Sequence, residues 1–150
     1  MLLKGSCHCR AVRFSLESET PVPYLWCYCS ICRKTAGGGG YAINIMGKAG
    51  TLKVKGATRI YRAMRSGGER HFCPKCASAL WVFDKRWPDW VYPFASAIDT
   101  PLPRPRPKER QLIFLGSKAN WAEVPAGRRF REYPKEAIVD WHRKRGLLRP

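Results

Sequence analysis

The chain has 150 residues, the length of one ordinary domain, and we expect residues 1–150 to fold around a single core. Its 28 Lys and Arg against 11 Asp and Glu give a formal charge of +17, which favours anionic partners without naming one. A hydrophobic content of 45% excludes disorder through low hydrophobicity, and no apolar run approaches the ~20 residues of a membrane helix. The N-terminus lacks a secretory signal pattern, so we expect a cytoplasmic protein without a membrane span.

Short strand-like stretches separated by turn formers predict a mainly β fold. In the first stretch Val12, Phe14 and Leu16 alternate with smaller or polar residues, which is the pattern of a half-buried strand. Turns spaced about ten residues apart favour antiparallel sheets over parallel strands joined by helices. The predicted strands are 10–16, 22–28, 41–45, 51–54, 59–64, 79–83, 91–97 and 111–115.

One helix is predicted, a short one in a basic C-terminal extension at about 134–146. Pro134 suits a first helical turn, Ile138 and Trp141 share one face, and Gly146 can end the helix. The preceding segment 99–108 contains four alternating prolines, which deny a sheet its donors. We expect it to be an extended surface connection; the alternative is a ligand for an aromatic groove on another protein.

Seven cysteines in a reducing setting indicate metal ligands or reactive thiols rather than disulfides. Two short cysteine pairs are the usual source of the four ligands of a closed structural zinc site. The set favoured here is Cys7, Cys9, Cys73 and Cys76. Three further thiols leave one coordination position open, as in catalytic zinc sites. They are Cys27, Cys29 and Cys32.

Spacing alone leaves other arrangements open. One is a single four-cysteine zinc site with the remaining cysteines as buried thiols, and another is a disulfide framework. In a third, His8 or His71 completes the second group as a closed site. Two metal sites use all seven cysteines, whereas a disulfide framework would leave one unpaired.

Three cysteine-containing motifs give the sequence a family resemblance. The motifs GSCHC at 5–9, CYCSICRK at 27–34 and FCPKC at 72–76 resemble the glutathione-dependent formaldehyde-activating enzyme family, which also contains centromere protein V. Weaker matches, SAID at 96–99 and SKANW at 117–121, extend the resemblance over about 3–125. The resemblance implies a zinc-binding β fold of the Mss4-like type.

The resemblance also implies that two zinc ions have different roles, one structural and one catalytic. Cys7, Cys9, Cys73 and Cys76 would hold a structural zinc ion, and Cys27, Cys29 and Cys32 a catalytic one. The expected partners are glutathione or a similar anionic thiol, and formaldehyde or another small aldehyde. The expected reaction is the formation of S-hydroxymethylglutathione, which in reverse is a carbon–sulfur lyase step.

The sequence departs from the family pattern at three positions outside the seven cysteines. Ala77 stands where the family usually has Gly, Leu112 where His is common, and Asn120 where Pro is common before Trp. Because the cysteines are all present, these differences concern substrate contacts and turn geometry rather than metal binding.

The residues that would contact the substrate are less well marked. Three thiolates on Zn²⁺ leave a net charge of −1, which Arg33, Lys34 and the backbone donors of 37–40 would offset while holding glutathione carboxylates. The alternative is that these charges are solvated and the glycines form a flexible turn. Most of the aromatic residues are expected in the core, with one or two, Trp26 or Trp121, near the ligand.

Two other functions compete with this enzyme. A zinc-stabilised nucleic-acid or chromatin-binding module is suggested by the last 50 positions, which hold 13 of the 28 basic residues. Against it, no helix-turn-helix, zinc-finger or RNA-recognition motif is present. In the other alternative the protein uses a different thiol or aldehyde, or only binds glutathione.

Overall fold

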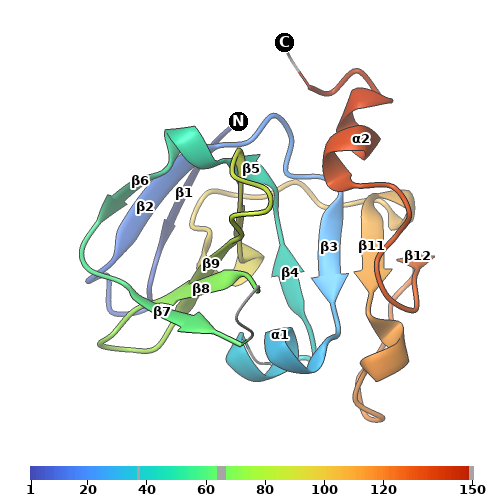
Figure 1. The fold of residues 1–150 in the computed structure, drawn as a ribbon, viewed down its shortest axis with the longest axis horizontal. Helices are drawn as coiled ribbons and strands as arrows, with labels where there is room; N and C mark the ends of the chain where they lie inside the picture. Colours follow the sequence, from blue (N-terminus) through green and yellow to red (C-terminus); the bar gives the residue numbers. More distant parts are fainter. Residues whose placement is uncertain (37, 64–66, 149–150) are drawn as a thin grey trace.

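Short strands make up most of the ordered structure in a computed structural model that describes residues 1–36, 38–63 and 67–148 (Figure 1). The strands are β1 (Leu2–Ser6), β2 (Arg13–Glu17), β3 (Tyr24–Cys27), β4 (Ala42–Asn44), β5 (Gly47–Lys48), β6 (Lys53–Lys55), β7 (Arg59–Arg62), β8 (Glu69–Phe72), β9 (Ala79–Phe83), β10 (Trp90–Pro93), β11 (Arg110–Ile113) and β12 (Arg128–Arg129). The helices are α1 (Ser30–Thr35) and α2 (Ile138–Arg143). None of the described helices is long and apolar enough to cross a membrane.

These strands form three sheets. The first has the order β1-β2-β6, the second β5-β10-β9-β8-β7 and the third β12-β11-β3-β4. The mainly β fold with a short helix near the C-terminus is therefore confirmed. In Figure 1, β3 runs toward α1, while α2 lies at the other end of β3 and β11.

The main core lies between the first and second sheets. Phe14 and Leu16 of β2 are buried there together with Leu80 and Trp81 of β9. The rings of Phe14 and Trp81 meet edge to face with their centroids 5.1 Å apart. The alternation of β2 that the sequence shows is thus the alternation between core and surface.

All eight predicted strand segments overlap an observed strand, although Met64 lies outside the described residues. Four strands were not predicted: β1, β5, β8 and β12. Two of these are only two residues long, and β8 is half-buried at every position, so it lacks the alternation that reveals a strand.

The prediction of antiparallel pairing is wrong for the third sheet. There β11 pairs in parallel with both β3 and β12, and only β3 and β4 are antiparallel. The long connection between β3 and β11 contains the second sheet, so β11 can return beside β3 in the same direction. Turn spacing reports local hairpins and carries no information on this long-range pairing.

The C-terminal helix is shorter than predicted. It begins at Ile138, after Ala137 in extended backbone, and ends at Arg143. Glu136 lies before its first turn. The Oε1 atom of Glu136 instead forms an ion pair with Lys144 Nζ at 3.0 Å. Ile138 and Trp141 are both buried, as their shared face predicts.

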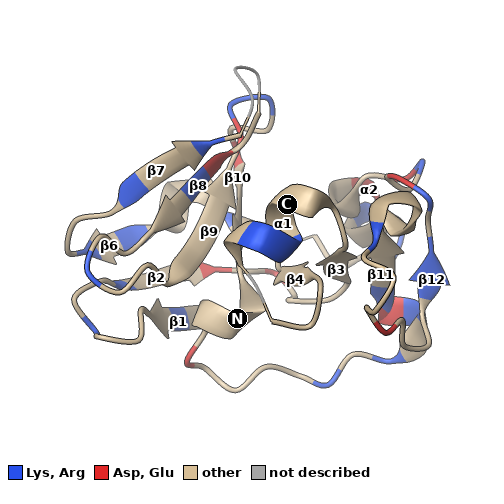
Figure 2. Ribbon diagram, turned by 90° about the horizontal axis from the view of Figure 1, so that it is seen from below, with Lys and Arg blue, Asp and Glu red and all other residues tan. Residues whose placement is uncertain are grey.

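The proline-rich segment forms no strand. Residues 101–106 have no regular secondary structure, and the segment ends in the short turn Pro107–Glu109 before β11. The hydroxyl group of Tyr24 donates a hydrogen bond to the carbonyl oxygen of Pro103 at 2.7 Å. In Figure 2 this segment runs along the lower edge of the molecule toward β11, which confirms a surface connection within the domain.

Candidate metal centres

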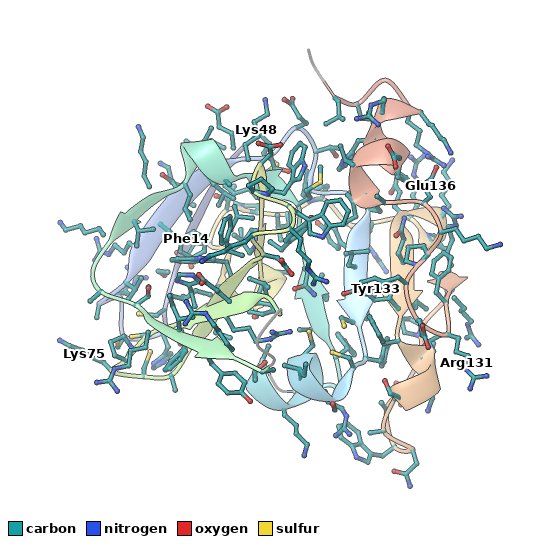
Figure 3. The ribbon with its side chains drawn as sticks, in the orientation of Figure 1. Phe14, Lys48, Lys75, Arg131, Tyr133 and Glu136 are labelled. Carbon is teal, nitrogen blue, oxygen red and sulfur yellow. The ribbon has the colours of Figure 1, made fainter. Side chains whose placement is uncertain are left out.

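The loop after β1 and the loop between β8 and β9 bring together the first cysteine group. Its four ligand atoms all lie within 4.8 Å of one another, on Cys7, Cys9, Cys73 and Cys76. The Sγ atoms of Cys7 and Cys9 are 3.5 Å apart, and those of Cys9 and Cys73 are 3.8 Å apart. Four sulfur atoms placed tetrahedrally at ~2.3 Å from zinc are roughly 3.8 Å apart, so the group fits a closed zinc site. Lys75, labelled in Figure 3, lies in the second of these loops.

Hydrogen bonds within the two loops hold these sulfur atoms in place. The backbone N–H of Cys7 donates to Val12 O at 3.0 Å, and the N–H of Val12 donates to Cys7 Sγ at 3.2 Å. The N–H of Cys73 donates to Ser78 O at 3.0 Å. The Ser78 hydroxyl group lies 3.2 Å from Cys76 Sγ and lowers the pKa of Cys76 to about 5. The thiolate form that binds zinc is therefore favoured at Cys76.

Each loop turns through one residue in the left-handed backbone region. Arg10 has a φ of 59° and Ala77 a φ of 58°. The backbone N–H of Ala77 donates to Cys73 O at 2.9 Å, which closes the turn around the cysteine pair. A residue with a Cβ atom is strained in this conformation by about 1–2 kcal/mol, whereas glycine is not.

Replacing Ala77 with glycine is therefore expected to stabilise the protein. The relief of strain exceeds the extra chain entropy of glycine, and we expect a gain of about 0.5–1 kcal/mol. Thermal unfolding of the zinc-loaded protein measures it. Ala79→Gly in β9 is the matched control and is expected to lower the melting temperature; an Ala77→Gly protein that melts below the wild type would contradict the argument.

The second cysteine group forms where β3 ends and α1 begins. Cys27 is the last residue of β3, Cys29 is the N-cap of α1, and Cys32 lies in the first turn of that helix. Their ligand atoms all lie within 4.8 Å of one another, and no fourth Cys, His, Asp or Glu of the described chain joins the group. The set fits three-coordinate binding of zinc by the protein, with one position open.

The three thiols of this group titrate as one unit. The pKa of Cys29 is lowered because Cys27 and Cys32 hydrogen-bond to its sulfur, and the backbone N–H of Cys32 donates to the same atom at 3.3 Å. Hydrogen bonding to the Cys29 sulfur raises the pKa of Cys27, and burial raises it further. Three adjacent thiolates repel one another, and a bound cation would relieve this repulsion.

Aromatic side chains surround this second group. Phe94, Phe114 and Phe130 pack in the same apolar cluster as Cys27 and Cys32. The sequence instead favoured one or two tryptophans. Trp26 stacks on Tyr41 with the ring centroids 4.6 Å apart and points to the face of β3 opposite Cys27, while Trp121 is 63% exposed.

One cation near the second group, Arg70, was not predicted from the sequence. Arg70 of β8 lies directly opposite Val82 of β9, which packs against the apolar cluster around Cys27. The Nη1 atom of Arg70 donates to Gly68 O at 3.2 Å, and its buried Nε has no hydrogen-bond partner. Against the opposing hydrogen bond from Cys27, hydrogen bonding to Cys29 and burial raise the pKa of Cys32 to about 11, and the positive charge of Arg70 is a smaller opposing effect. A polar strand with no clear periodicity gave no local signal for this contact.

Comparisons with known proteins show which family the chain belongs to. A model of the family "Glutathione-dependent formaldehyde-activating enzyme" matches residues 2–116. The chain belongs to this family. It is 58% identical, over 98% of each chain, to a Halomonas elongata protein named "Putative glutathione-dependent formaldehyde-activating enzyme". A crystal structure of a Rhodobacter sphaeroides protein superposes with a TM-score of 0.57 and 25% identity, and covers 67% of this chain and 92% of that one.

The structure explains two departures from the pattern of the glutathione-dependent formaldehyde-activating enzyme family. Ala77, in place of glycine, occupies the strained turn described above. Leu112 replaces a common histidine but is fully buried beside Tyr28, on the face of β11 opposite Ile113, which packs with Cys27. Its side chain therefore points away from the second cysteine group. Nothing in the structure explains Asn120.

Arg33 and Lys34, the predicted glutathione contacts in α1, lie in different surroundings. Lys34 lines a cavity of about 570 Å³ whose wall also includes Arg10, Ser78 and Cys76. Arg33 has a buried Nε atom without a hydrogen-bond partner. Gly37 lies outside the described residues. Lys34 therefore faces the first cysteine group, although its helix begins at the second.

The two histidines that the sequence considered as ligands lie outside both groups. His71 stacks on Trp81 with the ring centroids 4.9 Å apart, and its Nδ1 atom is 3.2 Å from the hydroxyl oxygen of Thr58. His8 is exposed, and its backbone N–H donates to the hydroxyl oxygen of Ser78 at 3.1 Å. Neither side chain completes the second group.

Proposed function

We propose that this protein is a zinc-dependent enzyme that joins glutathione, or a related anionic thiol, to formaldehyde or another small aldehyde. The reaction forms a carbon–sulfur bond, and its reverse is a lyase step. Cys27, Cys29 and Cys32 are the proposed ligands of the catalytic zinc ion. The family match and the name of the Halomonas elongata relative support the choice of substrates.

The observation that carries this proposal is the open three-thiol group. Cys29 is partly exposed while Cys27 and Cys32 are buried, so the group is accessible from the side of Cys29. A purely structural site would use a fourth protein ligand, as the first group does. A zinc ion held by three thiolates supplies either a lower pKa for a bound thiol or polarisation of an aldehyde carbonyl.

The residues around the second cysteine group would offset its negative charge and exclude water from it. Three thiolates with Zn²⁺ carry a net charge of −1, which would repel an incoming thiolate. We expect Arg70 to offset part of this charge, because its guanidinium group lies near enough to Cys32 to oppose the rise of that pKa. Phe94, Phe114 and Phe130 exclude water from one side of the sulfur atoms and so strengthen these electrostatic interactions.

The cavity beside α1 is the proposed place of the glutathione carboxylates. Lys34 and Arg10 line it, and each can pair with a carboxylate. Ala36 and Ala79 line the same cavity and also pack against the cluster that contains Cys27 and Cys32. A ligand bound there would therefore lie close to the second cysteine group.

Cys7, Cys9, Cys73 and Cys76 are the proposed ligands of a second, structural zinc ion, within a single zinc-binding domain of residues 1–150. The four thiols come from two loops, and Cys9 and Cys73 are 64 positions apart in the sequence. Binding one ion would tie these loops together and close a long segment of chain. Metal content should accordingly be two zinc ions per chain.

Adduct formation tests the proposed activity. Glutathione is titrated into zinc-loaded protein, formaldehyde is added, and NMR follows the appearance of S-hydroxymethylglutathione. We expect a rate above that of the same mixture without protein, a control that matters because the addition proceeds uncatalysed. A rate equal to the background would refute the enzyme with these substrates; glutathione-induced NMR shifts would then identify a binding protein.

A further inference from the structure

The C-terminal segment after the family match lies beside the second cysteine group. The match ends at residue 116, yet residues 130–132 run along the end of β11. The backbone N–H of Leu115 donates to Phe130 O at 3.1 Å, and the N–H of Phe114 donates to Glu132 O at 3.1 Å. Because β11 pairs with β3, which ends at Cys27, these hydrogen bonds fix the segment next to the cysteines.

Tyr133 continues this segment and packs on the aromatic wall of the site. Its ring meets the ring of Phe114 edge to face, with the centroids 4.6 Å apart. Phe114 in turn packs in the cluster that contains Cys27 and Cys32. The ring is therefore held within one layer of side chains of the thiols.

Tyr133 lies near the second cysteine group through its contact with Phe114, although the residue as a whole is 69% exposed. Desolvation by the surrounding protein is the main cause that raises the pKa of Tyr133. The charges of Cys27, Cys29 and Cys32 each raise this pKa further. Tyr133 also raises the pKa of Tyr92, which lies beside Val82 on the same face of the second sheet.

We propose that Tyr133, from outside the matched family region, is a catalytic residue whose hydroxyl group donates its proton to the aldehyde oxygen. This inference rests on the proposed function. The ordinary pKa of a phenol is already near ~10, and the pKa of Tyr133 is raised above it, so the hydroxyl group is protonated at neutral pH and is available as a proton donor. Because the residue is 69% exposed, we expect the hydroxyl group to recover a proton from solvent.

The proposed step balances without a further reactant. The glutathione sulfur, having lost its proton to solvent, attacks the carbonyl carbon and forms the carbon–sulfur bond. The electron pair of the carbonyl π bond moves to the oxygen, which takes the proton of the Tyr133 hydroxyl group. Solvent then returns a proton to Tyr133, so the net reaction is thiol plus aldehyde to hydroxymethyl thioether.

Comparing Tyr133→Phe with Tyr133→Ala distinguishes the contribution of the hydroxyl group to activity from that of the ring. Phenylalanine keeps the edge-to-face contact with Phe114 and removes only the oxygen. Because general acid catalysis contributes roughly 10²–10⁴-fold, we expect kcat to fall by about 100-fold in Tyr133→Phe, with KM for glutathione and zinc content unchanged. Tyr133→Ala is expected to be no more active than Tyr133→Phe. A Tyr133→Phe enzyme with wild-type kcat would overturn the proposal.

A second measurement tests the position of the hydroxyl group without activity. Protein labelled with ¹³C at the tyrosine Cζ atoms is loaded with Co²⁺ in place of Zn²⁺, and the Tyr133 signal is assigned by its loss in Tyr133→Phe. We expect a paramagnetic shift of this signal that disappears in Cys29→Ser, which should keep only the first metal. An unshifted Tyr133 signal would also overturn the proposal.

These two readouts distinguish the inference from the function on which it rests. A wild-type rate equal to the uncatalysed background would refute the proposed function and, with it, proton transfer by Tyr133. The cobalt shift would still establish or refute the position of the hydroxyl group beside the second cysteine group.

Discussion

Replacing Cys73 with serine is expected to lower the melting temperature by about 10–15 °C and to remove one of two zinc ions. Cys73 is fully buried, and its Sγ atom lies 3.8 Å from that of Cys9, 64 positions away in the sequence. A cross-link that closes a loop of this length is worth about 4 kcal/mol of chain entropy. That is a large part of the ~5–15 kcal/mol of stability typical of a domain.

Thermal unfolding and metal analysis of the purified protein measure this effect. Cys29→Ser is the matched control, since it makes the same atomic change in the other cysteine group. A chelator should destabilise the wild type to a similar degree, because it removes the same cross-link. If Cys73→Ser kept the wild-type melting temperature and both zinc ions, the structural role of the first group would be wrong.

The second large effect is expected on activity. Replacing Cys29 with serine should reduce adduct formation to the uncatalysed rate and leave one zinc ion per chain. Cys29 is the partly exposed member of the second group, and hydrogen bonds from Cys27 and Cys32 lower the pKa of its thiol. Serine is a preferred N-cap residue, so α1 should keep its start and the fold its stability.

Activity, zinc content and melting temperature are measured on the same Cys29→Ser sample. We expect the melting temperature to change by less than about 3 °C, since the loss of one cap interaction costs no more than ~1 kcal/mol. Turnover well above background would show that the second group is not the catalytic site. Unfolding of the variant would instead give Cys29 a structural role.

The nucleic-acid-binding alternative receives no support from the placement of the C-terminal charges. Lys144 pairs with Glu136 at 3.0 Å, and Arg143 pairs with Asp140, so part of the basic run is neutralised within the domain. Helix α2 is only six residues long, and its apolar face is buried. Steeply salt-dependent binding to duplex or single-stranded DNA would revive this alternative.

Some features of the site follow from neighbours in the sequence. Cys27, Cys29 and Cys32 lie within one strand end and one helical turn, so short-range geometry alone brings their thiols together. The alternation of β2 and the buried face of α2 are likewise local patterns. The pairing of the Cys7 and Cys73 loops was predicted by ligand number, because zinc prefers four thiolates from two cysteine pairs.

The other residues around the second cysteine group are placed there by the pairing of strands that are distant in the sequence. The parallel contact of β3 with β11 brings Phe114 and the segment of Tyr133 to the second cysteine group, more than eighty residues along the chain from Cys27. The register of β8 with β9 places Arg70 on the face that looks toward the same group. These side chains have no local signature, because their role depends on strands that meet only in the folded protein.

The sequence by itself therefore determined the kind of chemistry: a mainly β fold, two cysteine groups of four and three, and a family resemblance. The tertiary structure decided which other side chains surround the thiols, which turns are strained and where the helix begins. The physical reason is the range of the interactions. Metal ligands and strand patterns are encoded over a few residues, whereas charge balance and proton donors are supplied by segments that only folding brings together.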